Sequence, residues 1–249
     1  MQVNPSLVTK KHIFIHNIMN ATLKNILAIC IGILPLNGFM IWYRLTQTES
    51  FTTFDMLVYP LLFGGGNILL ILALNRYLLK KSFKNFNSGT QTWYWDIFSG
   101  FGLFLVSFVL MFAERATLSG VLSQGKPPSQ EVLNLMFDLA GNPLLLAIWL
   151  GPVVWIGVAM FEEFSRAFFL NCLWRLTKNK SWEFIIIFLV STVIGFTHLY
   201  QGTFGIVSVT IQGLVAGFFY YKYRRIRPLV ISHALYDSFQ IIMFVIQVN

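Results

Sequence analysis

The sequence is poor in charge and in cysteine. Only 11% of its 249 residues are charged, against 56% that are hydrophobic, and it has two cysteines and four histidines. So low a charged fraction excludes an ordinary soluble domain, in which about 25% of residues are charged. Cys30 and Cys172 both fall in apolar stretches, which excludes a disulfide framework and a cysteine-based zinc site.

Instead of charge, the sequence has long hydrophobic runs. Each comes close to the ~20 residues with which an α-helix crosses a bilayer. We therefore predict an all-α fold, a polytopic membrane helical bundle with about seven to eight transmembrane helices. A further apolar stretch, 142–152, ends at Pro152 and is expected to be an eighth, an interfacial or a half-crossing segment. The predicted spans cover residues 26–43, 56–75, 96–113, 153–174, 182–199, 204–221 and 229–247.

The net charge of +8 comes from basic residues whose positions fit a membrane topology. Most Lys and Arg residues fall in four clusters that occupy alternate connections between spans. The positive-inside bias then predicts a cytoplasmic N-terminus and a C-terminus on the other side, with Glu114 and Arg115 in an opposite-side loop. Nucleic-acid binding would need this charge on one accessible face, so we expect no nucleic-acid partner. The clusters are Lys10, Lys11 and Lys24; Arg76, Lys80, Lys81 and Lys84; Arg175, Lys178 and Lys180; and Lys222, Arg224, Arg225 and Arg227.

Ionisable residues on three predicted spans form a candidate site, because charge at membrane depth is costly and by default marks a function. Glu162 and Arg166 are four residues apart and share a helix face, so the Arg can neutralise and orient that carboxylate. Glu163 points about 100° away, which predicts that only one of the two Glu enters a cavity. The candidate residues are Glu162, Glu163, Arg166, His198, His233 and Asp237.

His233 and Asp237 are also four residues apart, an arrangement in which a carboxylate fixes the tautomer of an imidazole. A carboxylate, a histidine, and a second histidine with its partner can together activate water and stabilise an oxyanion. This equipment is suited to the hydrolysis of peptide bonds.

Over residues 161–240 these motifs resemble the CAAX prenyl protease and bacteriocin-processing family (CPBP, also called Abi), which are membrane-embedded endopeptidases. The family signatures are E-E-x-x-x-R, F-x-x-x-H, and H-x-x-x-N or H-x-x-x-D. They correspond to the Glu162 and Glu163 pair with Arg166, to His198, and to His233 with Asp237. We therefore expect a catalytic core over 141–249, preceded over 1–140 by a polar segment and three accessory transmembrane helices.

The resemblance implies a glutamate-dependent intramembrane protease that needs no cofactor. In such an enzyme Glu162 is the base that activates water, His198 is its partner, and His233 with Asp237 supports the oxyanion. Family members have also been described as metalloproteases, which would make Glu162, His198 and His233 zinc ligands. The sequence has no H-E-x-x-H helix, and we prefer the metal-free mechanism.

The expected partners are a peptide or membrane-protein substrate and the lipid bilayer, in a bacterial plasma membrane. The sequence sets neither the substrate nor the oligomeric state. One alternative is a catalytically inactive relative that acts as a membrane scaffold or as a bacteriocin self-immunity protein. A small transporter is a further alternative, although no inverted repeat of broken helices is found.

The sequence departs from the family pattern at three points. The Glu pair is one residue closer to Arg166 than in the usual form, so an alignment on that Arg puts Phe161 and Glu162 at the two Glu positions. Ile194 stands where the second motif has Phe. Asp237 replaces the amide found in part of the family, and an ionised Asp would repel an oxyanion.

The depths of the motifs also differ. Counted at ~1.5 Å per residue from the predicted cytoplasmic ends, Glu162 and His198 lie roughly 20–25 Å deep and His233 about 8 Å. Two arrangements would bring them together. Either the stretch 222–231 dips into the membrane as irregular backbone covered by protein or water, or the span boundaries are shifted.

Overall fold

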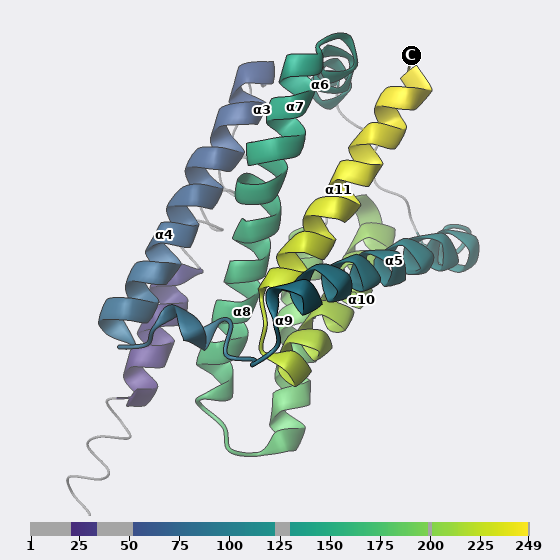
Figure 1. Ribbon diagram of the computed structural model, residues 1–249. Coiled ribbons are helices and arrows are strands. Elements are labelled where there is room, and N and C mark those ends of the chain that lie inside the picture. Colours follow the sequence, from purple (N-terminus) through teal and green to yellow (C-terminus); the bar gives the residue numbers. More distant parts are fainter. Residues whose placement is uncertain (1–20, 34–51, 123–129, 199–200, 249) are drawn as a thin grey trace, which may run out of the picture.

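The computed structural model describes residues 21–33, 52–122, 130–198 and 201–248 (Figure 1). Within these ranges the regular structure is helical, apart from one isolated bridge between Asn87 and Arg225. Five of the described helices are long and apolar enough to cross a membrane. This confirms an all-α integral membrane protein, whereas the predicted count of seven to eight spans is not confirmed. The five are Thr53–Leu78, Trp93–Leu118 (α5), Pro143–Trp174, Gly202–Tyr223 (α10) and Arg227–Gln247, which belongs to α11 (Arg227–Val248).

Two of the predicted spans correspond to shorter helices. Helix α9 (Lys180–Phe196) coincides with the predicted span 182–199 and has 17 residues. The predicted span 26–43 overlaps a short apolar helix, Ala21–Gly32, and its remainder from residue 34 lies outside the described residues.

The first long span joins four helical pieces, α3 (Thr53–Tyr59), η1 (Pro60–Gly64), α4 (Gly65–Ala73) and η2 (Leu74–Leu78). Its start is fixed by a capping box between Thr52 and Asp55. Gly64 lets this span approach the span Pro143–Trp174 closely, because a Cβ at Gly64 would lie 2.6 Å from the carbonyl oxygen of Gly157. The span is thereby held against the helix that carries the Glu pair.

The span Pro143–Trp174 consists of α7 (Pro143–Ile148), the π-helical stretch η4 (Trp149–Met160) and α8 (Phe161–Trp174). The sequence predicted that a separate segment, 142–152, ends at Pro152, and this is wrong. Proline removes one backbone donor, and Gly151 takes non-helical angles (φ −85°, ψ −106°), so the helix kinks there and continues. Wide π-helical turns are frequent at functional sites, and these turns lead directly into the Glu pair.

Helix α8 forms the centre of the core. Its side chains Ala167, Phe168 and Leu170 are almost completely buried, and Phe168 packs near the ring of Phe86. Helix α5 differs, because most of its 26 residues face outward and its buried residues are Asp96, Gly100, Met111 and Glu114. The core therefore lies around the start of the family-like motifs, with α5 at its edge.

The connection between α10 and α11 is covered by protein. Residues 224–226 link the two helices, and Arg225 and Ile226 are buried beneath the segment 83–92, which contains the 3₁₀ turn η3 (Phe83–Asn85). Arg225 donates to both carboxylate oxygens of Asp96 and, at 2.6 Å, to the carbonyl oxygen of Gly89. We call Asp96, Arg225 and Gly89 the clasp.

Despite the difference in depth expected from the sequence, His233 reaches Glu163 on α8. Of the stretch 222–231, only residues 224–226 are non-helical, with Arg224 in the left-handed region (φ 52°). Helix α11 begins at Arg227, whose side chain is exposed, directly after the buried residues Arg225 and Ile226. The C-terminus lies at the end opposite the α8–α9 connection (Figure 1), and the predicted orientation in the membrane stays a prediction.

Candidate active site

The first turn of α8 carries both glutamates. Arg166 forms a hydrogen-bonded ion pair with Glu163, three residues earlier on the same helix, and both residues are buried. The predicted pairing of Arg166 with Glu162 is therefore wrong. Helix geometry brings residues at both i+3 and i+4 within reach, and burial decides between them. The side chain of Glu163 is 3% exposed, whereas that of Glu162 is 26% exposed.

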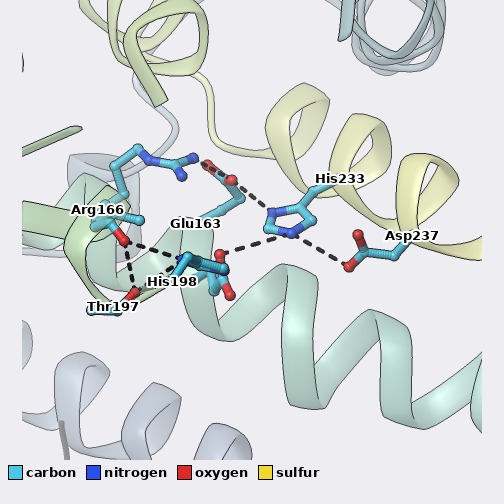
Figure 2. A network of polar contacts seen from close by, with 8 residues as sticks. Glu163, Arg166, Thr197, His198, His233 and Asp237 are labelled. Carbon is cyan, nitrogen blue, oxygen red and sulfur yellow. Dashed lines mark hydrogen bonds and ion pairs between the residues drawn. The ribbon is translucent and has the colours of Figure 1, made fainter. Parts of the chain in front are cut away.

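His233 on α11 faces this turn of α8 (Figure 2). Its Nδ1 lies 2.9 Å from Oε1 of Glu163. Its Nε2 lies 3.4 Å from Oδ2 of Asp237 and 3.8 Å from Oε2 of Glu162. The two helices thus bring together Glu162, Glu163, Arg166, His233 and Asp237, which we call the acidic cluster.

The contacts of His233 revise the role expected of Asp237. The close hydrogen bond that fixes the ring comes from Glu163 and not from the residue one turn later. At Nε2, both carboxylate distances exceed the usual N–H···O range of 2.7–3.2 Å. This nitrogen therefore faces Glu162 and Asp237 without a close hydrogen bond to either carboxylate.

His198 follows the last residues of α9. Its Nδ1 lies 3.2 Å from the carbonyl oxygen of Ile194 and 3.2 Å from the hydroxyl of Thr197. A carbonyl only accepts hydrogen bonds, so Nδ1 donates to it and Nε2 is left as the acceptor of the neutral ring. The orienting atom belongs to the backbone, which explains why Ile194 can replace the Phe of the family motif.

Electrostatic contacts join His198 to the acidic cluster. Asp237 lies within electrostatic range of His198, of Glu162 and of Glu163, and Figure 2 shows His198 on the same side of α8 as His233. Close packing of α9 on α10 fixes the position of His198, because a Cβ at Gly195 would lie 2.7 Å from the carbonyl oxygen of Ile206. The structure therefore brings all six predicted site residues into one region.

Acid exceeds base in this cluster. Three carboxylates, those of Glu162, Glu163 and Asp237, face one guanidinium and one imidazole. Within the described ranges, Oε2 of Glu163 and Nε of Arg166 are buried without a hydrogen-bond partner. An excess of acceptors at membrane depth is suited to taking up a proton.

The zinc alternative has no geometric support in the described part of the chain. No three His, Cys, Asp or Glu side chains there form a group that could hold a metal ion. Glu162, His198 and His233 lie in one region, but they do not surround a common point as zinc ligands would.

Two polar contacts near the site were missed by the sequence analysis. Asn67 on α4 donates to the hydroxyl of Ser165 at 3.0 Å and so ties the site turn of α8 to the first long span. An asparagine inside an apolar run was its signal. Glu114, expected in a loop, is buried within α5 and accepts a hydrogen bond from Ser208. The prediction of a loop there is wrong because α5 continues to Leu118.

Comparison with known families identifies this region. Residues 144–239 match the sequence profile of the Rce1-like type II CAAX prenyl endopeptidase family. This stretch is an Rce1-like domain. It contains all six site residues, and the resemblance read from the motifs is confirmed. Membership of the domain in this family implies a membrane protease that acts on protein substrates. No curated protein and no solved structure matches the chain.

Proposed function

We propose that this protein is an intramembrane endopeptidase that hydrolyses peptide bonds with a water activated by Glu162. The observation that carries the proposal is the acidic cluster itself, in which two helices bring three carboxylates, an arginine and a histidine together between apolar spans. Charges at this depth are costly, and a site for water and a polar substrate accounts for them.

Glu162 is the base in this proposal. A general base needs a carboxylate oxygen that water can reach, and the carboxylate of Glu162 is the more exposed of the pair. Glu163 is held by Arg166 and by His233, so its role is to fix the imidazole. This assignment keeps the base expected from the sequence, for a different physical reason.

The reaction then follows from the contacts. Water attacks the carbonyl carbon of the scissile bond and gives its proton to Glu162, with His198 as partner. In this proposal His233 is an imidazolium: its Nδ1–H donates to Glu163, and its Nε2–H donates a hydrogen bond to the oxyanion on the side of the ring that faces Glu162 and Asp237. Glu162 returns the proton to the nitrogen of the leaving amine as the C–N bond breaks, which gives a free carboxylate and a free amine.

The shortened first motif is compatible with this function. The shorter spacing would inactivate the enzyme if it separated the glutamates from their arginine, but Arg166 still pairs with Glu163 at one turn's distance. This contact supports an active enzyme over an inactive scaffold or self-immunity protein. We further propose the bacterial plasma membrane, with a cytoplasmic N-terminus, as its location.

The test is a cleavage assay on the purified full chain in lipid nanodiscs. A farnesylated peptide ending in a CAAX sequence and an unprenylated membrane-spanning peptide serve as substrates, in water enriched in ¹⁸O. We expect new peptide ends, with one ¹⁸O atom in the new carboxylate, detected by mass spectrometry. Intact peptides after prolonged incubation would refute the protease function and favour the scaffold.

A further inference from the structure

A second polar site lies between α5 and α10, outside the acidic cluster. Glu114 on α5 is 4% exposed and accepts a hydrogen bond from the hydroxyl of Ser208 on α10. One turn further along α10, the amide of Gln212 donates to the carbonyl oxygen of Ser107 at 3.3 Å. These contacts join the two helices at two successive turns.

The side chains of Glu114 and Gln212 each have an oxygen that accepts no hydrogen bond from a described residue. Among the residues that the structure describes, Oε1 of Glu114 and Oε1 of Gln212 are buried without a hydrogen-bond partner. A buried acceptor without a donor carries the full cost of its desolvation, and hydrocarbon supplies no donor. Two such atoms on neighbouring turns indicate a ligand that brings its own N–H or O–H groups.

The spacing of the two acceptors fits a peptide backbone. Ser208 marks where the carboxylate of Glu114 meets α10, and Ser208 and Gln212 are four residues apart, which is about 6 Å along a helix. An extended chain rises about 3.3 Å per residue, and its N–H groups on one edge recur every second residue, so they repeat at about 6.6 Å. Two backbone N–H groups of one extended peptide can therefore reach both acceptors, and main-chain bonds of this kind give affinity without a sequence requirement.

The second site is connected to the acidic cluster. Tyr236, next to Asp237 on α11, lies within electrostatic range of both Asp237 and Glu114. Helix α10 begins at Gly202, four residues after His198, and leads from that histidine to Ser208 and Gln212. Helix α5 packs along α11, which carries His233 (Figure 1).

We infer that Glu114 and Gln212 bind the backbone of the peptide substrate, at residues about three to five positions from the scissile bond. That interval is the stretch of extended chain that spans the roughly 9–15 Å from the start of α10 to Ser208 and Gln212. Both acceptors are buried, so the peptide enters where α5, the helix at the edge of the core, separates from α10. The inference rests on the proposed peptide hydrolysis.

The test is a double-mutant cycle between protein and peptide. A farnesylated CAAX peptide is prepared with a single N-methyl group at each backbone amide in turn, which removes one N–H donor. Binding of each peptide to the full chain in nanodiscs is measured in the Glu162→Gln background, with and without Glu114→Leu. At one position we expect N-methylation to weaken binding about tenfold when Glu114 is present and less than twofold when it is replaced.

A second cycle and a control keep the test decisive. Gln212→Leu should couple to the N-methyl group two residues away from the one that couples to Glu114, and this cycle stands alone if Glu114→Leu does not fold. Thr117→Val removes a hydroxyl from α5 that bonds only within its own helix, and it should leave every N-methyl effect unchanged. Equal effects of N-methylation with and without both acceptors would overturn the inference. If the unaltered protein does not cleave the unmethylated peptide, the proposed function is refuted instead.

Discussion

The clasp and the acidic cluster are two buried ionic groups built in opposite ways. In the clasp, each of the three side-chain nitrogens of Arg225 donates a hydrogen bond, two to Asp96 and one to Gly89. A second arginine, Arg227, lies 3.7 Å from the same carboxylate. In the acidic cluster, three carboxylates share one arginine and one histidine. Two polar atoms there lack partners within the described ranges.

The difference separates a structural ion pair from a reactive one. A charge-balanced group in which every arginine nitrogen is hydrogen-bonded is suited to structure, and its role is to hold the α10–α11 connection against the segment 83–92. A group with surplus acid and open positions holds charge that a reaction can use. The clasp should therefore control stability, and the acidic cluster should control turnover.

The largest expected effect is on the clasp. Arg225→Leu leaves the buried carboxylate of Asp96 without its partner, so we expect the free energy of unfolding to fall by about 3–5 kcal/mol. Arg227→Leu is the matched control, because that arginine is 55% exposed at its side chain and should contribute less than about 1 kcal/mol. Denaturant unfolding in micelles measures both. Similar losses in the two variants would remove the distinction between clasp and surface charge.

The next effect concerns the base. Glu162→Gln keeps the shape of the side chain and removes its basicity, so we expect cleavage to fall at least ~100-fold with unfolding unchanged. Glu183→Gln makes the same change in a carboxylate on α9 away from the cluster and should retain activity.

Glu163→Gln separates the two glutamates. This change leaves the buried Arg166 without a negative partner, so it should lower stability as well as activity. Near-normal turnover in Glu162→Gln, together with a stable but inactive Glu163→Gln protein, would reverse the assignment of the base.

The sequence was sufficient to choose residues that the structure brings together, but not to predict their contacts. Charge inside apolar runs, together with the family motifs, predicted six site residues, and these six lie in one region. The partner of Arg166 was wrong because the spacings i+3 and i+4 are equally good on a bare helix, and burial, which the sequence does not give, chooses between them. The same missing information concealed that Glu163 holds His233.

Some predictions of the fold were wrong for related reasons. Pro152 predicted the end of the segment 142–152, but the packed helix tolerates the lost donor by kinking and widening. The burial of the α10–α11 connection depends on a pair 129 residues apart, Asp96 with Arg225, and helical periodicity carries no information at that distance. The expected boundary near residue 140 stays a prediction, and α5, which precedes it, contacts α11 through Gly100 and Ile231.

The smallest expected effect is at Asp237. Asp237 faces Nε2 of His233 at 3.4 Å. It is not needed to hold the ring in place, because the hydrogen bond to Glu163 already does so. Asp237→Asn keeps an acceptor there, so kcat should fall by no more than roughly threefold, and Asp237→Leu by about tenfold, the scale of one hydrogen bond to a charged group. Stability should be unchanged in both, since the clasp is intact. A kcat loss above 100-fold in Asp237→Asn would show that the negative charge itself is required, and the acidic cluster would then need all three of its carboxylates.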